Sequence, residues 1–151
     1  MVTIGAVLPI SVISMGGFIM SDKTPIDIVT AYFAALAEGR VTDALALFHP
    51  QIQWHQPGDN RFSGVHIGPE NVDALLGGMM EVSQGSLVVV PTGPLMGNGD
   101  FVAVPVRFTG HRDGASLDQP GMDLITVQNA YITAVHLFSS DGPAEDEFWG
   151  S

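Results

Sequence analysis

The chain has 151 residues, enough for one domain with a buried core. Hydrophobic residues make up 46% of it and charged residues 14%, which excludes a disordered composition. With 16 acidic residues against five Lys and Arg, the formal net charge is -11, so nucleic acid and anionic membrane surfaces should be repelled. The absence of cysteine excludes disulfides, zinc–thiolate sites and thiol chemistry. We expect a cytoplasmic protein whose ligand is a small, neutral and largely apolar molecule.

Residues 1–20 carry no charged side chain and include Pro9 and several glycines. A secretory signal needs basic residues at its start, and a membrane-spanning helix needs about 20 apolar residues. We therefore interpret this stretch as an apolar N-terminal extension ahead of a natural start at Met20. The alternative is an apolar tail that packs on a partner subunit. Residues 21–151 are predicted to form a single domain.

Three helices are predicted in the first half of the chain. The first begins at Thr24, a capping residue, followed by Pro25 at the first helical position and Asp27 at the capping-box position. A short second helix is predicted over residues 42–48. A third begins at Pro69, where apolar residues recur at helical spacing.

Strands account for most of the rest. Residues 51–56 alternate so that Ile52, Trp54 and Gln56 share one face and His55 lies on the other. A loop is predicted over residues 57–68. Further strands are expected over residues 86–92, 101–109, 115–127 (broken at Pro120-Gly121) and 131–139. The acidic C-terminal segment ends in Phe148-Trp149, which can fold back on the body.

This order of elements, α-α-β-α-β-β-β-β, predicts an α+β domain in which the N-terminal helices pack on a strongly curved, mostly antiparallel sheet. Such a sheet partly wraps the helices and leaves a cone-shaped cavity at one end. The chain has no nucleotide-binding loop, no nucleophile elbow and no H-E-x-x-H motif, and its histidines show no i,i+4 pairing. We expect neither a metal nor a cofactor.

Two residues stand out as candidates for chemistry. Asp123 shares a strand face with Ile125 and Val127, so its carboxyl lies on an apolar face. If that face is buried, the carboxyl stays protonated and can donate a hydrogen bond; if it is exposed, Asp123 is an ordinary surface residue. Tyr32 lies beside the apolar stripe of the first helix, either as a core residue with its hydroxyl at the rim or as part of a site.

Several segments resemble the ketosteroid isomerase and SnoaL-like group of the NTF2-like superfamily. They are VTAYFAALAEG over residues 29–39, ALF over 46–48, WHQP over 54–57, MDLITV over 122–127, ITAV over 132–135 and the ending EFWG over 147–150. The resemblance implies an NTF2-like cone, a homodimer, and an oxyanion hole formed by Tyr32 and a protonated Asp123. The position of the isomerase's general base falls on Gln56, which cannot accept a proton.

The chain also resembles limonene epoxide hydrolases of the same superfamily. Those enzymes have an arginine two residues before the aspartate, where this chain has Gly121, so the resemblance does not carry over their reaction. SnoaL-type polyketide cyclases fit better, because they use a pocket aspartic acid as the general acid for ring closure without a cofactor. The resemblance assigns that role to Asp123.

Other residues are candidates to assist or to line a pocket. His136 is predicted to share a strand face with Ile132 and Phe138 and is a weak catalytic candidate. For each candidate the competing interpretation is a plain core or surface residue. The ligand-binding candidates are Trp54, Phe62, Met79, Met80, Phe101 and His111.

The favoured hypothesis is a cofactor-free enzyme, of cyclase or isomerase type, acting on an apolar ketone-bearing metabolite. The missing base at Gln56 motivates an alternative, a non-catalytic small-molecule-binding protein. A third hypothesis is a dimerisation or protein-interaction module built on the same fold.

Overall fold

The computed structural model of the chain describes residues 23–151, so the proposed extension over residues 1–20 lies outside the described residues. Within the described range the helices are α1 (Pro25–Ala37), α2 (Val41–Leu45), α3 (Pro69–Val82) and α4 (Gly142–Trp149). The strands are β1 (Phe48–Gln56), β2 (Gly64–Ile67), β3 (Val88–Pro91), β4 (Met96–Asn98), β5 (Phe101–Arg112), β6 (Ala115–Gln128) and β7 (Tyr131–Ser139). None of these helices combines the length and the apolar character that crossing a bilayer requires.

Helix α1 begins as the sequence predicts. The hydroxyl of Thr24 accepts a hydrogen bond from the backbone N–H of Asp27 at 3.1 Å, and the Asp27 carboxylate accepts one from the N–H of Thr24 at 3.0 Å. This reciprocal capping box satisfies two of the free N–H groups at the helix start. It fixes the register in which Val29 and Tyr32 face the core.

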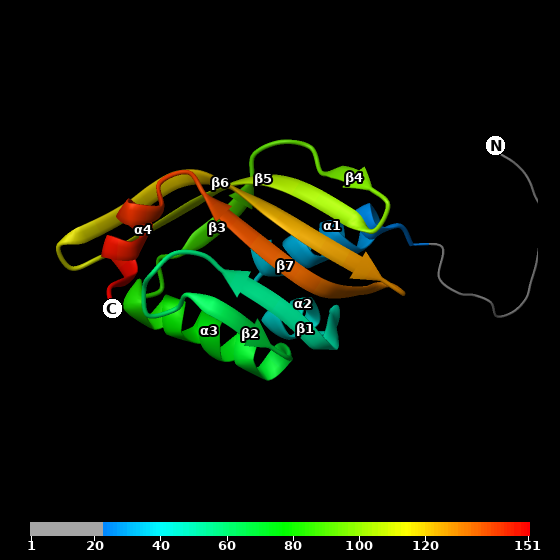
Figure 1. Cartoon of the computed structure of the whole chain (residues 1–151), viewed down its shortest axis with the longest axis horizontal. Helices are drawn as coiled ribbons and strands as arrows, with labels where there is room; N and C mark the ends of the chain where they lie inside the picture. Colours follow the sequence, from blue (N-terminus) through cyan, green and yellow to red (C-terminus); the bar gives the residue numbers. More distant parts are fainter. Residues whose placement is uncertain (1–22) are drawn as a thin grey trace, which may run out of the picture.

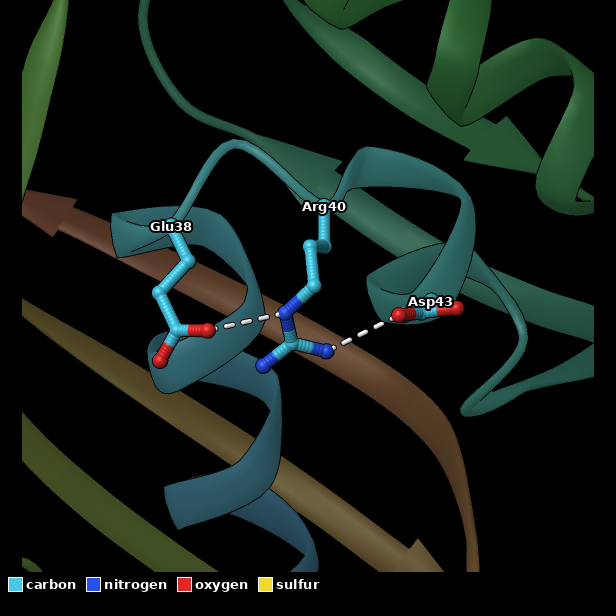
Figure 2. A network of polar contacts seen from close by, with 3 residues as sticks. All are labelled: Glu38, Arg40 and Asp43. Carbon is cyan, nitrogen blue, oxygen red and sulfur yellow. Dashed lines mark hydrogen bonds and ion pairs between the residues drawn. The ribbon is translucent and has the colours of Figure 1, made fainter.

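One exposed arginine in the turn between α1 and α2 links acidic residues on either side of it (Figure 2). The Arg40 guanidinium donates to Glu38 at 2.9 Å and to Asp43 at 2.9 Å. Because all three groups are exposed, the network contributes little free energy to the stability of the fold.

The strands form one sheet in the order β2-β1-β7-β6-β5-β3, with β4 pairing beside β3 on β5. Neighbouring strands are antiparallel except β1 and β7, which are parallel. Helix α4 lies at the end of the sheet near the turn between β5 and β6, and β4 lies at the opposite end (Figure 1). The predicted α+β architecture, with N-terminal helices packed on a mostly antiparallel sheet, is confirmed.

The core fills the space between the helices and the inner face of this sheet. Its members include Val29 from α1 and Val72 from α3, which meet Ile52 and Ile125 from the strands. The predicted shared face of Ile52, Trp54 and Gln56 is confirmed, because all three are buried. That face leads directly to the site.

Strand β6 runs unbroken through Pro120-Gly121, so the predicted interruption is wrong. Pro120 has no N–H to donate, but β7 ends at Ser139, opposite Gly121, so no ladder hydrogen bond is lost there. The Pro120 carbonyl still accepts from the N–H of Ser140 at 3.2 Å.

Three other boundaries differ from the prediction. The second helix is shorter, because Phe48 already begins β1. The predicted loop over residues 57–68 contains β2, which pairs antiparallel with the end of β1. The acidic C-terminal segment forms α4, which buries Phe148 and Trp149 against the body.

Candidate functional site

A cavity of about 110 Å³ lies between the inner face of the sheet and helices α1, α3 and α4. Most of the side chains around it are apolar, and the polar ones are few. Val89 of β3 is partly exposed at its edge, so the cavity reaches the surface there. The lining residues are Tyr32, Phe33, Leu36, Trp54, Gln56, Leu76, Met79, Leu87, Val89, Val106, Phe108, Asp123, Leu137, Phe138, Ser139, Glu145 and Trp149.

Asp123 is the polar group at the centre of the sheet's inner face. It pairs with Val104 of β5 and Leu137 of β7, and only 9% of the residue is exposed. Its carboxyl makes no hydrogen bond to any side chain or backbone group among residues 23–151. Burial raises the pKa of Asp123 to about 7, because the charged form would lose its hydration. At neutral pH a large fraction of this carboxyl is therefore protonated and able to donate.

Tyr32 projects from α1 into the same cavity. Its ring packs against Phe33, with ring centroids 5.2 Å apart, and against Phe48, with centroids 5.6 Å apart. Burial and the neighbouring Asp123 raise the pKa of Tyr32, so its hydroxyl stays neutral. Tyr32 and Asp123, the two leading candidates, are thus brought together.

Gln56 is buried at the end of β1 and lines the cavity. Its side-chain oxygen accepts a hydrogen bond from the indole N–H of Trp54 at 3.0 Å. Because an indole N–H can only donate, the amide oxygen must face Trp54. The amide NH₂ is therefore left to donate elsewhere, which makes Gln56 a hydrogen-bond donor for a ligand.

Glu145 is the polar residue that sequence reasoning missed. It lies in the first turn of α4 and is only 5% exposed. One carboxylate oxygen accepts from the Ser139 hydroxyl, and the other accepts from the indole N–H of Trp149 at 3.1 Å. A capping residue at Asp141 followed by Gly142-Pro143 could have indicated this helix, whereas the sequence analysis expected only that Phe148-Trp149 can fold back on the body.

The remaining ligand-binding candidates divide into two groups. Trp54 and Met79 line the cavity. Phe62 lies behind it, with its ring edge-to-face on Trp149 at 5.3 Å between centroids. Met80 points outward from α3, and Phe101 and His111 are exposed on β5, so these three do not contribute to the lining.

His136 does not enter the cavity. It shares a strand face with Phe138 as predicted, but Ile132 lies on the opposite, buried face. Thr126 pairs with Ala134 but Val127 pairs with Ile132, so Thr133 is an extra residue, a bulge. The bulge reverses the alternation of side chains, and His136 falls on the outer face. There its ring stacks on His55, with centroids 3.9 Å apart.

Gly121 has no room for a side chain. A Cβ at this position would lie 2.5 Å from the carbonyl oxygen of Phe138 and 2.8 Å from the ring of Phe108. The aromatic ring of Phe108 therefore occupies the space into which a side chain at position 121 would project. This packing agrees with the absence of an arginine two residues before Asp123.

Among residues 23–151, no group of three or more His, Asp and Glu side chains is placed to hold a metal ion. The polar groups that a ligand would meet are the side chains of Tyr32, Gln56, Asp123 and Glu145, together with the Ser139 hydroxyl. Tyr32, Gln56 and a protonated Asp123 can donate hydrogen bonds to a ligand, whereas the Ser139 hydroxyl donates to the Glu145 carboxyl group.

The fold, in which helices pack on a mostly antiparallel sheet around a cavity, is shared with several solved structures described as NTF2-like, which gives the class of fold. Within that class the chain belongs to the SnoaL-like domain family, which matches residues 29–135.

Individual relatives agree with this assignment. An uncharacterized protein of Mycobacterium tuberculosis is 32% identical over 130 residues, which cover 86% of this chain and 99% of the relative. A Xanthomonas campestris protein of unknown function, with a cystatin-like fold, is 39% identical with a TM-score of 0.81, covering 85% of this chain and all of that one. TerC, co-crystallized with polyporic acid, shares the fold at 19% identity and a TM-score of 0.73, covering 85% of this chain and 100% of TerC.

Proposed function

We propose that the protein binds a small apolar molecule bearing a ketone and catalyses cofactor-free acid/base chemistry of the cyclase or isomerase type on it. The observation that carries this proposal is Asp123, an unpartnered buried carboxyl that faces an apolar cavity and has a pKa of about 7. A carboxyl in this state can give its proton to a substrate at neutral pH.

Asp123 would act on the carbonyl oxygen of the ketone. As a carbon–carbon bond or an enol forms, negative charge develops on that oxygen, and a donor aimed at it lowers the barrier. Tyr32 supplies a second neutral donor beside Asp123, and the Gln56 amide supplies a third. The surrounding apolar side chains exclude water and strengthen each of these interactions.

The size of the cavity limits the ligand. A buried apolar cavity of roughly 150 Å³ accommodates benzene, and this one measures about 110 Å³. The buried part of the ligand is therefore close to a single ring, and any larger portion would extend past Val89. TerC, with polyporic acid, supports a small-molecule ligand for a protein of this fold.

Replacement of Asp123 by Asn tests the proposal. Asparagine keeps the shape and can still donate a hydrogen bond, but it has no proton to transfer. With single-ring ketones as substrates and mass spectrometry as the readout, we expect turnover to fall by roughly 10² to 10⁴-fold. Asp118→Asn, on the exposed face of the same strand, should leave turnover unchanged. Retained turnover in Asp123→Asn would refute the assignment.

The alternative is a protein that binds the same ligand without converting it. Gln56 favours this alternative, since an amide at the base position donates hydrogen bonds but accepts no proton. The same incubation separates the two functions, because a pure binding protein returns the ligand unchanged from the wild type as well.

We also propose a homodimer formed through the outer face of the sheet. Val65 and Ile67 on β2 leave more than half of their surface exposed on that face. A contact with a second copy would bury them. Light scattering should give about twice the monomer mass of 16.0 kDa, and Ile67→Glu should yield the monomer. A monomeric wild type would contradict the proposal.

A further inference from the structure

The position of Glu145 at the cavity depends on hydrogen bonds between α4 and β6, the strand that carries Asp123. Gln119, four residues before Asp123 on β6, donates from its amide nitrogen to the backbone carbonyl of Asp141 at 3.0 Å. Its amide oxygen accepts from the N–H of Asp141 at 2.8 Å. Asp141 caps α4, so this paired contact fixes the start of the helix and places Glu145 in its first turn.

The two carboxyl groups of the cavity lie in different environments. Burial raises the pKa of Glu145, the hydrogen bonds from Ser139 and Trp149 lower it in part, and the adjacent Asp146 raises it again. Asp123 is buried without any such donor. Hydrogen bonds to a carboxylate stabilise its charged form, so Glu145 is equipped to be the anion and Asp123 the acid. Each Glu145 oxygen keeps a second lone pair for a proton from a ligand.

The sheet register places the residue that holds Glu145 two residues away from the partner of Asp123 on β7. Asp123 pairs with Leu137, and Gly121 pairs with Ser139, the residue that holds Glu145. Two residues along a strand span about 7 Å. The Phe108 ring, rather than a polar side chain, lies over Gly121 in this interval.

We propose that Glu145 is the base of this site, a role that rests on the proposed function of Asp123. The Glu145 carboxylate takes a proton from the carbon next to the ketone, and the electron pair of that C–H bond forms the new carbon–carbon double bond. The carbonyl π electrons move to the oxygen, which takes the proton of Asp123. The product is an enol, with Asp123 ionised and Glu145 protonated. Where the substrate also carries a carbon–carbon double bond conjugated with this enol, the intermediate is a dienol. The Glu145 proton then returns to the far end of the dienol while the enol O–H proton returns to Asp123, which regenerates the ketone, moves the double bond and restores both carboxyl groups without a cofactor.

Two probes separate this role from that of Asp123. Cyclohex-2-enone in D₂O, followed by proton NMR, reports hydrogen exchange next to the carbonyl. Phenol, a stable analogue of the enol, reports binding at the donors through calorimetry. Glutamine at position 145 can keep both polar contacts, because the Ser139 hydroxyl can accept as well as donate.

For Glu145→Gln we expect exchange to fall by about 10²-fold or more while the Kd for phenol stays within about threefold. Glu147→Gln, an exposed position of the same helix, is the matched control and should exchange like the wild type. Unchanged exchange in Glu145→Gln, or a wild type that binds phenol without exchange, overturns the role of Glu145. A wild type that does not bind phenol overturns the proposed function itself.

The Ser139→Ala variant provides a second test, the pH dependence of exchange. This test remains valid even if Glu145→Gln fails to fold. Loss of one donor raises the pKa of Glu145, so the rise of exchange with pH should move to higher pH. The charged groups near Glu145, namely Asp146 and Asp123, are the same in both proteins. A pH profile identical to that of the wild type would contradict the proposal.

Discussion

Replacing Asp123 by Asn is expected to stabilise the protein relative to the wild type by an amount that grows as the pH rises from 5 to 8.5. Burial raises the pKa of Asp123 from 3.8 to about 7, so the folded state binds this proton more tightly than the unfolded state. The group's contribution to the free energy of unfolding is full below the unfolded pKa and is lost as pH rises through the folded pKa. Between pH 5 and pH 8.5 the free energy of unfolding of the wild type should therefore fall by about 3 kcal/mol through this group, and that of the Asn variant should not.

Urea unfolding of both proteins at pH 5, 7 and 8.5 measures this difference. The lowest pH of the series, pH 5, stays above the isoelectric point near 4.4, where the protein would carry no net charge. Glu145 also has a raised pKa, but it is present in both proteins and cancels in the comparison. A stability difference that stays constant across this pH range would show that the Asp123 carboxyl is not protonated in the folded protein at neutral pH.

Truncation of Phe148 to Ala should destabilise the protein by about 3 to 5 kcal/mol, as for other fully buried aromatic residues. The side chain is 1% exposed, and its ring packs against Trp149, with centroids 4.9 Å apart. Arg112 lies 5.7 Å from the centre of the ring and donates to the Phe148 carbonyl at 2.7 Å. Loss of the ring would thus remove one of the buried contacts that hold α4 against the body.

The matched control is Phe101→Ala, because Phe101 is 49% exposed at the far end of the sheet. This change should cost less than about 1 kcal/mol. Urea unfolding of the wild type and the two variants at one pH measures the two losses of stability. Equal costs would mean that α4 is a peripheral segment rather than part of the core, and that the wall it provides for the cavity is dispensable.

Local signals were sufficient to predict the elements that bring the two leading candidates together. The capping residues around Pro25 define the start of α1, and its apolar spacing places Tyr32 on the inner side. Alternation along β6 places Asp123 with Ile125 and Val127. These features depend only on residues close in sequence, which is why they can be predicted without knowledge of the fold.

Features that depend on distant partners were not predictable in the same way. The bulge at Thr133 arises from the pairing of β7 with β6, and it moves His136 to the outer face. Strand β2 forms because its residues pair with β1, although their composition is that of a loop. Glu145 looks like one acid among many until α4 docks and Ser139 and Trp149 donate to it.

Gln56 illustrates a residue whose position could be predicted but whose role required the structure. Alternation places it beside Trp54 on the inner face, and the resemblance places it where a base would be. Only the contact with the indole N–H establishes that its oxygen is occupied and that its NH₂ is the group left for a ligand.

The Asp123 carboxyl lies in the cavity with a pKa raised far enough for a substantial fraction to be protonated near neutral pH, and the NMR signal of its side-chain carbon reports this protonation directly. The carboxyl ¹³C resonance of Asp123, assigned by its absence in Asp123→Asn, can be followed by NMR as a function of pH in the ligand-free protein. A midpoint of about 7 is the predicted result. A midpoint near 4, the value of an exposed aspartate, would contradict the account.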